Sequence, residues 1–67
     1  MDEGYPILAF FKYDHLPERL QAISRECSVL AHAMADAHPN SAETAAGLRK
    51  LLEAKDCFVR AALAARS

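Results

Sequence analysis

The side chains best suited to chemistry are cations in the last third of this sequence, and the chemistry they suit is anion binding. Arg49 and Arg60 fall on one side of a predicted helix together with Asp56. A planar guanidinium matches phosphate oxygens, so arginines from several copies of the chain would surround an anion if the chain self-associates. The alternative interpretation is a solvated face held by Arg49–Glu53 and Asp56–Arg60 ion pairs.

Lys55 is unusual because it lies near the middle of the apolar arc of the same predicted helix. Two interpretations are open. Its aliphatic stem extends along the helix interface so that the ammonium reaches water. Alternatively, the ammonium neutralises a phosphate or a neighbouring carboxylate at a junction between subunits.

Tyr13 is the residue best placed to bind a flat ring. It lies two residues before His15 and close to Arg19, and an aromatic ring beside cations stacks on nucleobases, a contact worth about 1–3 kcal/mol per base. Aromatic residues that precede a helix more commonly cap the core, and we expect that role for Phe10 and Phe11.

The sequence contains no set of residues typical of catalysis. It has no nucleophile beside a base, no paired carboxylates and no glycine-rich phosphate loop, and its 2 glycines are too few for a dinucleotide fingerprint. His15, His32 and His38 lack metal-ligand spacing on one helix face. We therefore expect no enzymatic activity, no catalytic residue, no metal and no cofactor.

Composition and charge narrow the class of protein further. The 67 residues are 52% hydrophobic and 25% charged, with a formal net charge of −1, which is typical of a folded globular chain. This balance disfavours binding to duplex DNA or RNA, and no apolar run is long enough to span a membrane. The acidic start does not resemble a signal peptide. We expect a cytosolic protein with reduced Cys27 and Cys57; one bridge between them is the alternative.

The first half of the chain predicts an N-terminal segment followed by a helix. Residues 1–15 have no helical period, and their aromatic run predicts an extended or short helical segment. Pro17 suits the first turn of a helix, which we expect to span about residues 17–37. Its apolar residues step by four and three, as in an amphipathic helix: Leu16, Leu20, Ile23, Cys27, Leu30 and Met34.

The second half predicts a sharp turn and another helix. Pro39 ends the first helix, and either Asn40 or Ser41 can cap the next one, which we expect at about residues 42–65. A connection this short makes the two helices antiparallel neighbours. The predicted fold is therefore an all-α two-helix hairpin, with residues 1–67 forming one domain.

The apolar face of the second predicted helix is wider than one partner helix can bury. It spans an arc of about 140°. Gly47, inside the same predicted helix, predicts either close backbone approach or fraying. A chain of this length buries only about 60% of its unfolded surface, so self-association is the expected source of additional stability. We predict a homo-oligomer. The apolar arc comprises Leu48, Leu51, Leu52, Phe58, Val59, Ala62 and Leu63.

Taken in order, the motifs of the chain resemble a known family. Over about residues 10–66 the chain is similar to the small helical-hairpin domain shared by the anti-CBASS and anti-Thoeris sponge proteins of bacteriophages. Each motif alone is weakly specific, and their order around a short proline turn is more specific. The motifs are Phe11-Lys12-Tyr13, Pro17-Glu18-Arg19-Leu20-Gln21-Ala22-Ile23, Leu30-Ala31, Pro39-Asn40-Ser41-Ala42-Glu43 and Leu48-Arg49-Lys50-Leu51-Leu52-Glu53-Ala54, followed by an alanine-rich end.

The resemblance implies a phage protein of the host bacterial cytoplasm that binds cyclic nucleotide immune signals without cleaving them. Such sponges are homo-oligomers, often hexamers, with cyclic dinucleotides held between protomers. Some relatives hold cyclic trinucleotides at a second type of junction, and others take cyclic ADP-ribose isomers. By this resemblance Tyr13 stacks on a base and Arg25 contacts a phosphate. Arg49, Lys50 and Arg60 are further candidate anion contacts, supported mainly by their charge.

Four positions in the first predicted helix depart from the family pattern. Many relatives have a second tyrosine where this chain has Leu20, and lysines or arginines where it has Ser24, Glu26 and Ser28. Arg25 substitutes for such a cation, shifted by one residue. Two interpretations stay open: the ligand differs from the best-known one, or this chain has lost one of two sites.

The competing hypothesis is a structural or host-protein-binding helical oligomer with no small-molecule ligand. Such a protein would dock on its partner through the aromatic segment 5–13, and it would bind no cyclic nucleotide. An enzyme that turns over cyclic nucleotides is a third and more remote hypothesis.

Overall fold

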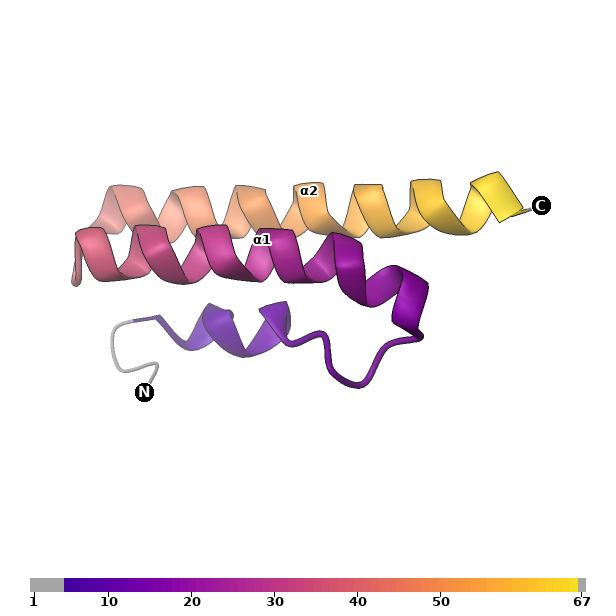
Figure 1. The fold of residues 1–67 in the computed structure, drawn as a ribbon. Coiled ribbons are helices and arrows are strands. Elements are labelled where there is room, and N and C mark those ends of the chain that lie inside the picture. The colour runs from indigo at the N-terminus through magenta and orange to yellow at the C-terminus, as the bar shows by residue number, and fades with distance from the viewer. Residues whose placement is uncertain (1–4, 67) are drawn as a thin grey trace.

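The computed structural model describes residues 5–66, and every regular element in that range is helical (Figure 1). A 3-10 helix, η1 (Pro6–Phe11), precedes two long helices, α1 (Glu18–Ala37) and α2 (Ala42–Arg66). The long helices lie side by side in opposite directions, joined by a tight turn. The predicted all-α fold with a long helix pair is confirmed.

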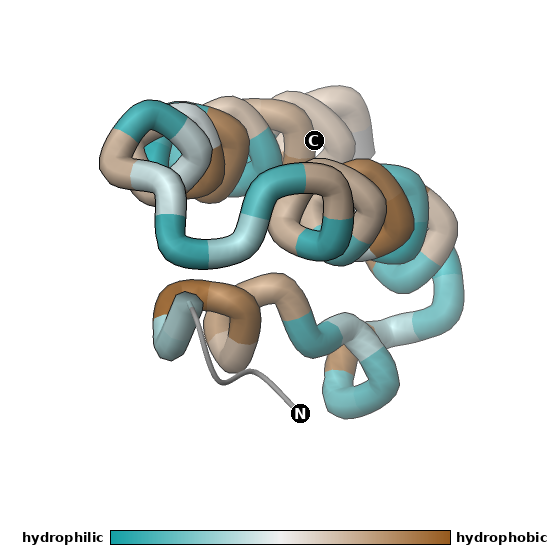
Figure 2. The backbone as a smooth tube through the Cα atoms, turned by 90° about the vertical axis from the view of Figure 1, so that its left-hand side faces the viewer, coloured by the Kyte–Doolittle hydropathy of each residue, from teal (hydrophilic) through white to brown (hydrophobic). Residues whose placement is uncertain are grey.

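The N-terminal segment forms a short helix with one buried face. A 3-10 helix has three residues per turn, so Tyr5, Leu8 and Phe11 align on one side, and all three are buried. This side packs against both α1 and α2 (Figure 2). Pro6 suits the first position because its φ angle is already helical. Phe10 points away and is 66% exposed, so the expectation that it caps the core is wrong, whereas Phe11 lies in the core.

The hydroxyl group of Tyr5 fastens this segment to the turn between the long helices. It accepts a hydrogen bond of 2.8 Å from the Ser41 N–H and donates one to the carbonyl oxygen of His38. Ser41 is also the cap of α2, because its Oγ accepts a 3.1 Å hydrogen bond from the Thr44 N–H. Asn40 instead adopts a left-handed conformation with φ of 63°, which asparagine tolerates better than most residues.

The core face of α1 is rotated relative to the predicted apolar stripe. Leu20 and Cys27 are buried as expected, but Leu30 and Met34 are each 47% exposed. Small side chains take their place and let α1 approach η1 and α2 closely. These buried small residues are Ser24, Ser28, Ala31 and Ala35.

The surplus of apolar surface predicted for the second helix is present on α2. Leu48 is in the core at 2% exposure, whereas Phe58 and Leu63 are 55% and 46% exposed. The last turns of α2 also extend beyond the start of α1 (Figure 1). Even with this apolar surface, no helix within residues 5–66 is long and apolar enough to cross a membrane.

Candidate ligand-binding surface

Three of the candidate residues, Tyr13, Arg25 and Arg60, line hollows along the segment between η1 and α1, residues 12–17. A 3.0 Å hydrogen bond from the Leu16 N–H to the Tyr13 carbonyl oxygen closes a turn in this segment. The side-chain amide of Gln21 donates a 2.8 Å hydrogen bond to the Leu16 carbonyl oxygen, which fastens the turn to the start of α1. The half-buried Tyr13 therefore projects from a held backbone.

Tyr13 and Arg25 line the same surface hollow, which has a volume of about 230 Å³. Gln21 and Ala22 of α1 form part of its wall, so α1 carries most of the site. Glu18 also lines it, and its carboxylate offsets the charge of the guanidinium. This hollow, called here the Tyr13 hollow, thus offers an aromatic ring, a hydrogen-bonding amide and one cation. It is not strongly positive.

A second hollow of about 360 Å³ borders Tyr13 as well. Its other lining residues are Lys12, Asp14, Ser28 and His32. Tyr13 therefore lines two surface depressions.

Three of the four positions at which this chain differs from the sponge pattern that it resembles are buried. Leu20 is 5% exposed, Ser24 is fully buried and Ser28 is 8% exposed. A lysine in place of Ser24 or Ser28 would lose its hydration in this structure. Arg25 is exposed on the same helix, which explains how a cation is available there although the neighbouring positions carry none.

The cations of α2 do not form one site within a single chain. Arg49, Lys50 and Arg60 are all exposed, and none of them lines the Tyr13 hollow. Arg49 and Arg60 share a helix face but lie about 16 Å apart along the axis. Lys50 is turned about 80° away from Arg60. Any anion held by Arg49 and Arg60 together would therefore need a second copy of the chain.

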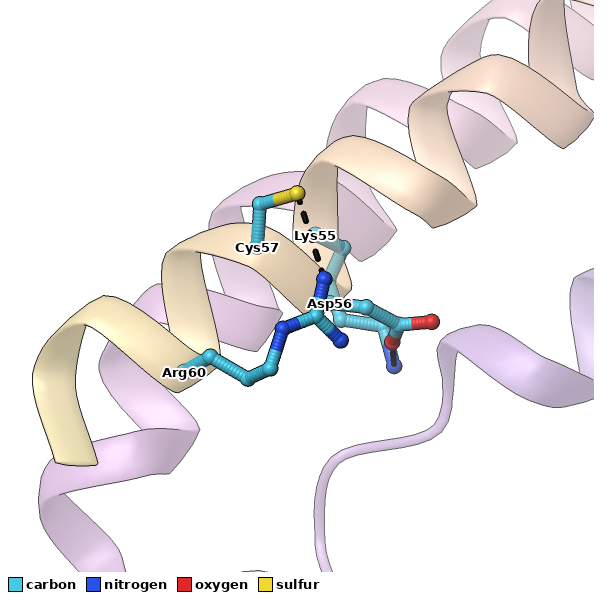
Figure 3. Close-up of polar contacts among 4 residues, drawn as sticks. All are labelled: Lys55, Asp56, Cys57 and Arg60. Carbon is cyan, nitrogen blue, oxygen red and sulfur yellow. Dashed lines mark hydrogen bonds and ion pairs between the residues drawn. The ribbon is translucent and has the colours of Figure 1, made fainter. Parts of the chain in front are cut away.

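The ion pairs predicted along α2 are replaced by other contacts (Figure 3). Asp56 Oδ1 pairs with Lys55 Nζ at 3.3 Å rather than with Arg60, and Arg60 Nη2 donates to Cys57 Sγ at 3.3 Å. The expected Asp56–Arg60 pair is therefore wrong, and within residues 5–66 an Arg49–Glu53 pair is also not formed. Lys55 buries its stem and meets a neighbouring carboxylate.

Sequence reasoning missed a third hollow, in which Lys12 and His15 face Lys55 and Arg60 of α2. Only the path of residues 12–17 brings these four side chains together. Their spacing in the sequence has no period that would have revealed it.

No family model, curated protein or solved structure matches this chain. Within residues 5–66, histidine, cysteine and acidic side chains form no group of three that could hold a metal ion. The function of the protein is therefore inferred from its fold, its surface chemistry and its motifs.

Proposed function

We propose that this protein is a sponge that binds cyclic oligonucleotide or cyclic ADP-ribose-type immune signals without cleaving them. The observation that carries the proposal is the Tyr13 hollow, where an aromatic ring and the Arg25 guanidinium lie together. A ring face suits a nucleobase, and a guanidinium suits the phosphate attached to it. The protein would act for a phage in the host bacterial cytoplasm, depriving host effectors of their activator.

The size of the Tyr13 hollow supports binding at a junction between copies. Its volume is about 230 Å³, whereas pockets that enclose a drug-sized ligand measure about 300–1,000 Å³. A cyclic dinucleotide has two bases and two phosphates, so one hollow accommodates only part of it. A symmetric oligomer repeats one junction several times, and paired hollows would enclose the whole ligand.

An apolar groove on the hairpin supports the self-association that such junctions require. The groove has a volume of about 300 Å³, and Leu30, Met34 and Leu51 are among its lining residues. Gly47 also lines it, and a Cβ atom at Gly47 would meet nothing within 4 Å. No close approach occurs at Gly47 within one chain, so the bare backbone is open to a helix of another copy. We propose a homo-oligomer, with six copies by analogy to the family.

The competing proposal of docking through segment 5–13 is less well supported. Tyr5, Leu8 and Phe11 all face the core, so most of the large side chains of that segment contact the protein's own helices. Phe10 is its large exposed hydrophobic residue, and a single exposed aromatic side chain is common on protein surfaces.

Native mass spectrometry of the full chain tests the proposal, alone and with a panel of cyclic dinucleotides, cyclic trinucleotides and cyclic ADP-ribose isomers. We expect a defined oligomer that gains a fixed number of intact ligands. Tyr13→Ala should weaken binding by about tenfold or more, because a stacking contact is lost. Tyr13→Phe keeps the ring and should bind like the wild type, with the same oligomer mass in both variants.

Other outcomes would contradict the proposal in distinguishable ways. A defined oligomer that takes up no ligand would favour the protein-binding alternative, and new products after incubation would reveal an enzyme. A bare monomer would remove the junctions on which the site depends. Equal binding by Tyr13→Ala and Tyr13→Phe would place the ligand elsewhere. Single Arg49→Gln, Lys50→Gln and Arg60→Gln changes then test whether the cations of α2 contact it.

A further inference from the structure

The hollow missed by sequence reasoning gathers cations from two distant parts of the chain. It has a volume of about 210 Å³; Lys12 and His15 enter it from segment 12–17, and Lys55 and Arg60 enter it from α2. Asp56 is the acidic residue among those that line it. Three permanent cations therefore meet one carboxylate, in a chain whose formal net charge is −1. The positive charge is concentrated at this hollow and could not be inferred from the net charge of the whole chain. We call this the Lys55 hollow.

Lys55 is the most enclosed of these cations. Its side chain is 12% exposed, and its ammonium lies 3.3 Å from a carboxylate oxygen of Asp56, whose own side chain is 50% exposed. An ammonium carries three donors, and this contact occupies one. Leu16 and Val59 line the hollow beside it, and apolar walls lower the local dielectric constant, which strengthens attraction for an anion.

Arg60 also has donors to spare. Its Nη2 group donates to Cys57 Sγ at 3.3 Å, and a thiol sulfur is a weak acceptor that an oxyanion would readily replace. Figure 3 shows the guanidinium turned back along α2 toward Lys55 and Asp56. A planar guanidinium can bind two oxygens of one anion, and a nearby ammonium can bind a third.

We propose that the Lys55 hollow binds a phosphate-class oxyanion, with Lys55 and Arg60 as its main ligands and Lys12 and His15 facing it from the linker. A volume of about 210 Å³ has room for such an anion, since one water occupies about 30 Å³ in the liquid. The anion is either free phosphate or a phosphate group of a nucleotide. The site lies outside the Tyr13 hollow and does not depend on the proposed function.

An NMR titration of the full chain with inorganic phosphate at constant ionic strength, with sodium chloride as the balancing salt, tests the site. We expect saturable shifts in the backbone amides of residues 12–16 and 55–60. Lys55→Met keeps the apolar stem and removes the charge, and Arg60→Gln changes an exposed side chain that the fold does not need. Each should weaken phosphate binding at least tenfold. Arg19→Gln changes an exposed side chain that does not line the hollow; it is the matched control and should bind phosphate like the wild type.

Four outcomes would overturn the site. The first is a shift that rises linearly without saturation, and the second is a response spread evenly over all basic residues. The third is unchanged binding in Arg60→Gln, which decides the matter even if Lys55→Met fails to fold. A loss in Arg19→Gln equal to that in Arg60→Gln would also mean that only general charge is being measured.

A parallel titration with cyclic di-AMP distinguishes the two sources of the anion. If a nucleotide phosphate occupies the hollow, Arg60→Gln weakens cyclic di-AMP binding and free phosphate competes with it. If free phosphate is the ligand, Arg60→Gln weakens phosphate binding alone. Saturable phosphate binding without any cyclic nucleotide binding would retain the hollow and remove the sponge function. If the Arg60 and Lys55 variants bind phosphate like the wild type and cyclic nucleotide binding is intact, the Lys55 hollow is ruled out as a phosphate site and the sponge function is retained.

Discussion

At the turn end of the molecule, η1 packs against the second half of α1 and the first half of α2. At the linker end, residues 12–17 lie beside the first half of α1 and the second half of α2. The Tyr5 hydroxyl bonds at 2.8 Å to Ser41, far along the chain, whereas the linker is held by the nearby Gln21. The large core residues Phe11 and Leu48 belong to the turn end. Stability is thus concentrated at one end and candidate chemistry at the other, as expected when a rigid scaffold supports a functional segment.

The largest effect that tests this comparison comes from two adjacent phenylalanines. Phe11 is fully buried at the turn end, and Phe10 is 66% exposed and lines the Lys55 hollow. Phe11→Ala should lower the free energy of unfolding by about 3–5 kcal/mol. A domain of this size has roughly 0.05–0.15 kcal/mol per residue to lose, so much of the protein would unfold. Phe10→Ala should change it by about 0.5 kcal/mol or less. Urea denaturation measures both, and a large loss in Phe10→Ala would mean that another copy covers this ring.

The two tyrosines give the next largest difference. Tyr5→Phe removes a hydroxyl that accepts from the Ser41 N–H and donates to the His38 carbonyl oxygen. Two backbone groups lose their partner, so we expect a loss of about 1–2 kcal/mol in unfolding free energy. Tyr13→Phe should stay within about 0.5 kcal/mol, because Tyr13 lies among the surface hollows. Equal losses in the two variants would show that the linker end is as tightly held as the turn end.

These differences show how far the sequence alone determines the fold. The proline turn and the helix after Pro17 follow from local rules, because a fixed φ angle and a missing N–H act on their immediate neighbours. The core face of α1 does not follow from such rules. Leu30 and Met34 match the stripe of an ideal two-helix contact, but η1 packs on the other side, where only small residues such as Ala31 and Ala35 leave room. The periodicity of α1 did not predict where η1 would pack.

The candidate site was predictable to a similar degree. Tyr13 and Arg25 were proposed from the residues and their resemblance to a family, and the structure places them in one hollow. The convergence of Lys12 with Lys55 depends on the path of an irregular linker, and irregular backbone has no repeat from which side-chain direction can be derived. Arg49, Lys50 and Arg60 of α2 all carry a positive charge but do not form one site within a single chain, so charge alone did not predict which of them lie together.

Two serines, one in each half of the molecule, test the same comparison through changes of about 1 kcal/mol in the free energy of unfolding. Ser24, on the linker half of α1, is fully buried, and its Oγ has no hydrogen-bond partner. Ser41 caps α2 at the turn end. Ser24→Ala should raise the free energy of unfolding by about 1 kcal/mol, because an unsatisfied buried hydroxyl is removed. Ser41→Ala should lower it by about 1 kcal/mol. Thermal unfolding of both variants gives the sign directly, and destabilisation by Ser24→Ala would indicate that the hydroxyl has a partner inside the folded chain.

The smallest expected effect is a difference between the two free cysteines, buried Cys27 and exposed Cys57, in the pH dependence of stability and in reactivity. Burial raises the pKa of the Cys27 thiol, the Lys55 ammonium opposes the rise, and Glu26 adds to it. The pKa of the Cys27 thiol is higher in the folded than in the unfolded state, so the folded state favours the protonated thiol. The contribution of this thiol to the free energy of unfolding is complete below the unfolded pKa. It is lost as the pH rises through the folded value. The free energy of unfolding should therefore decline in the alkaline range, and less steeply in Cys27→Ala. A thiol reagent at neutral pH should modify Cys57 well before Cys27; equal rates would mean that the hairpin opens readily enough to expose its core.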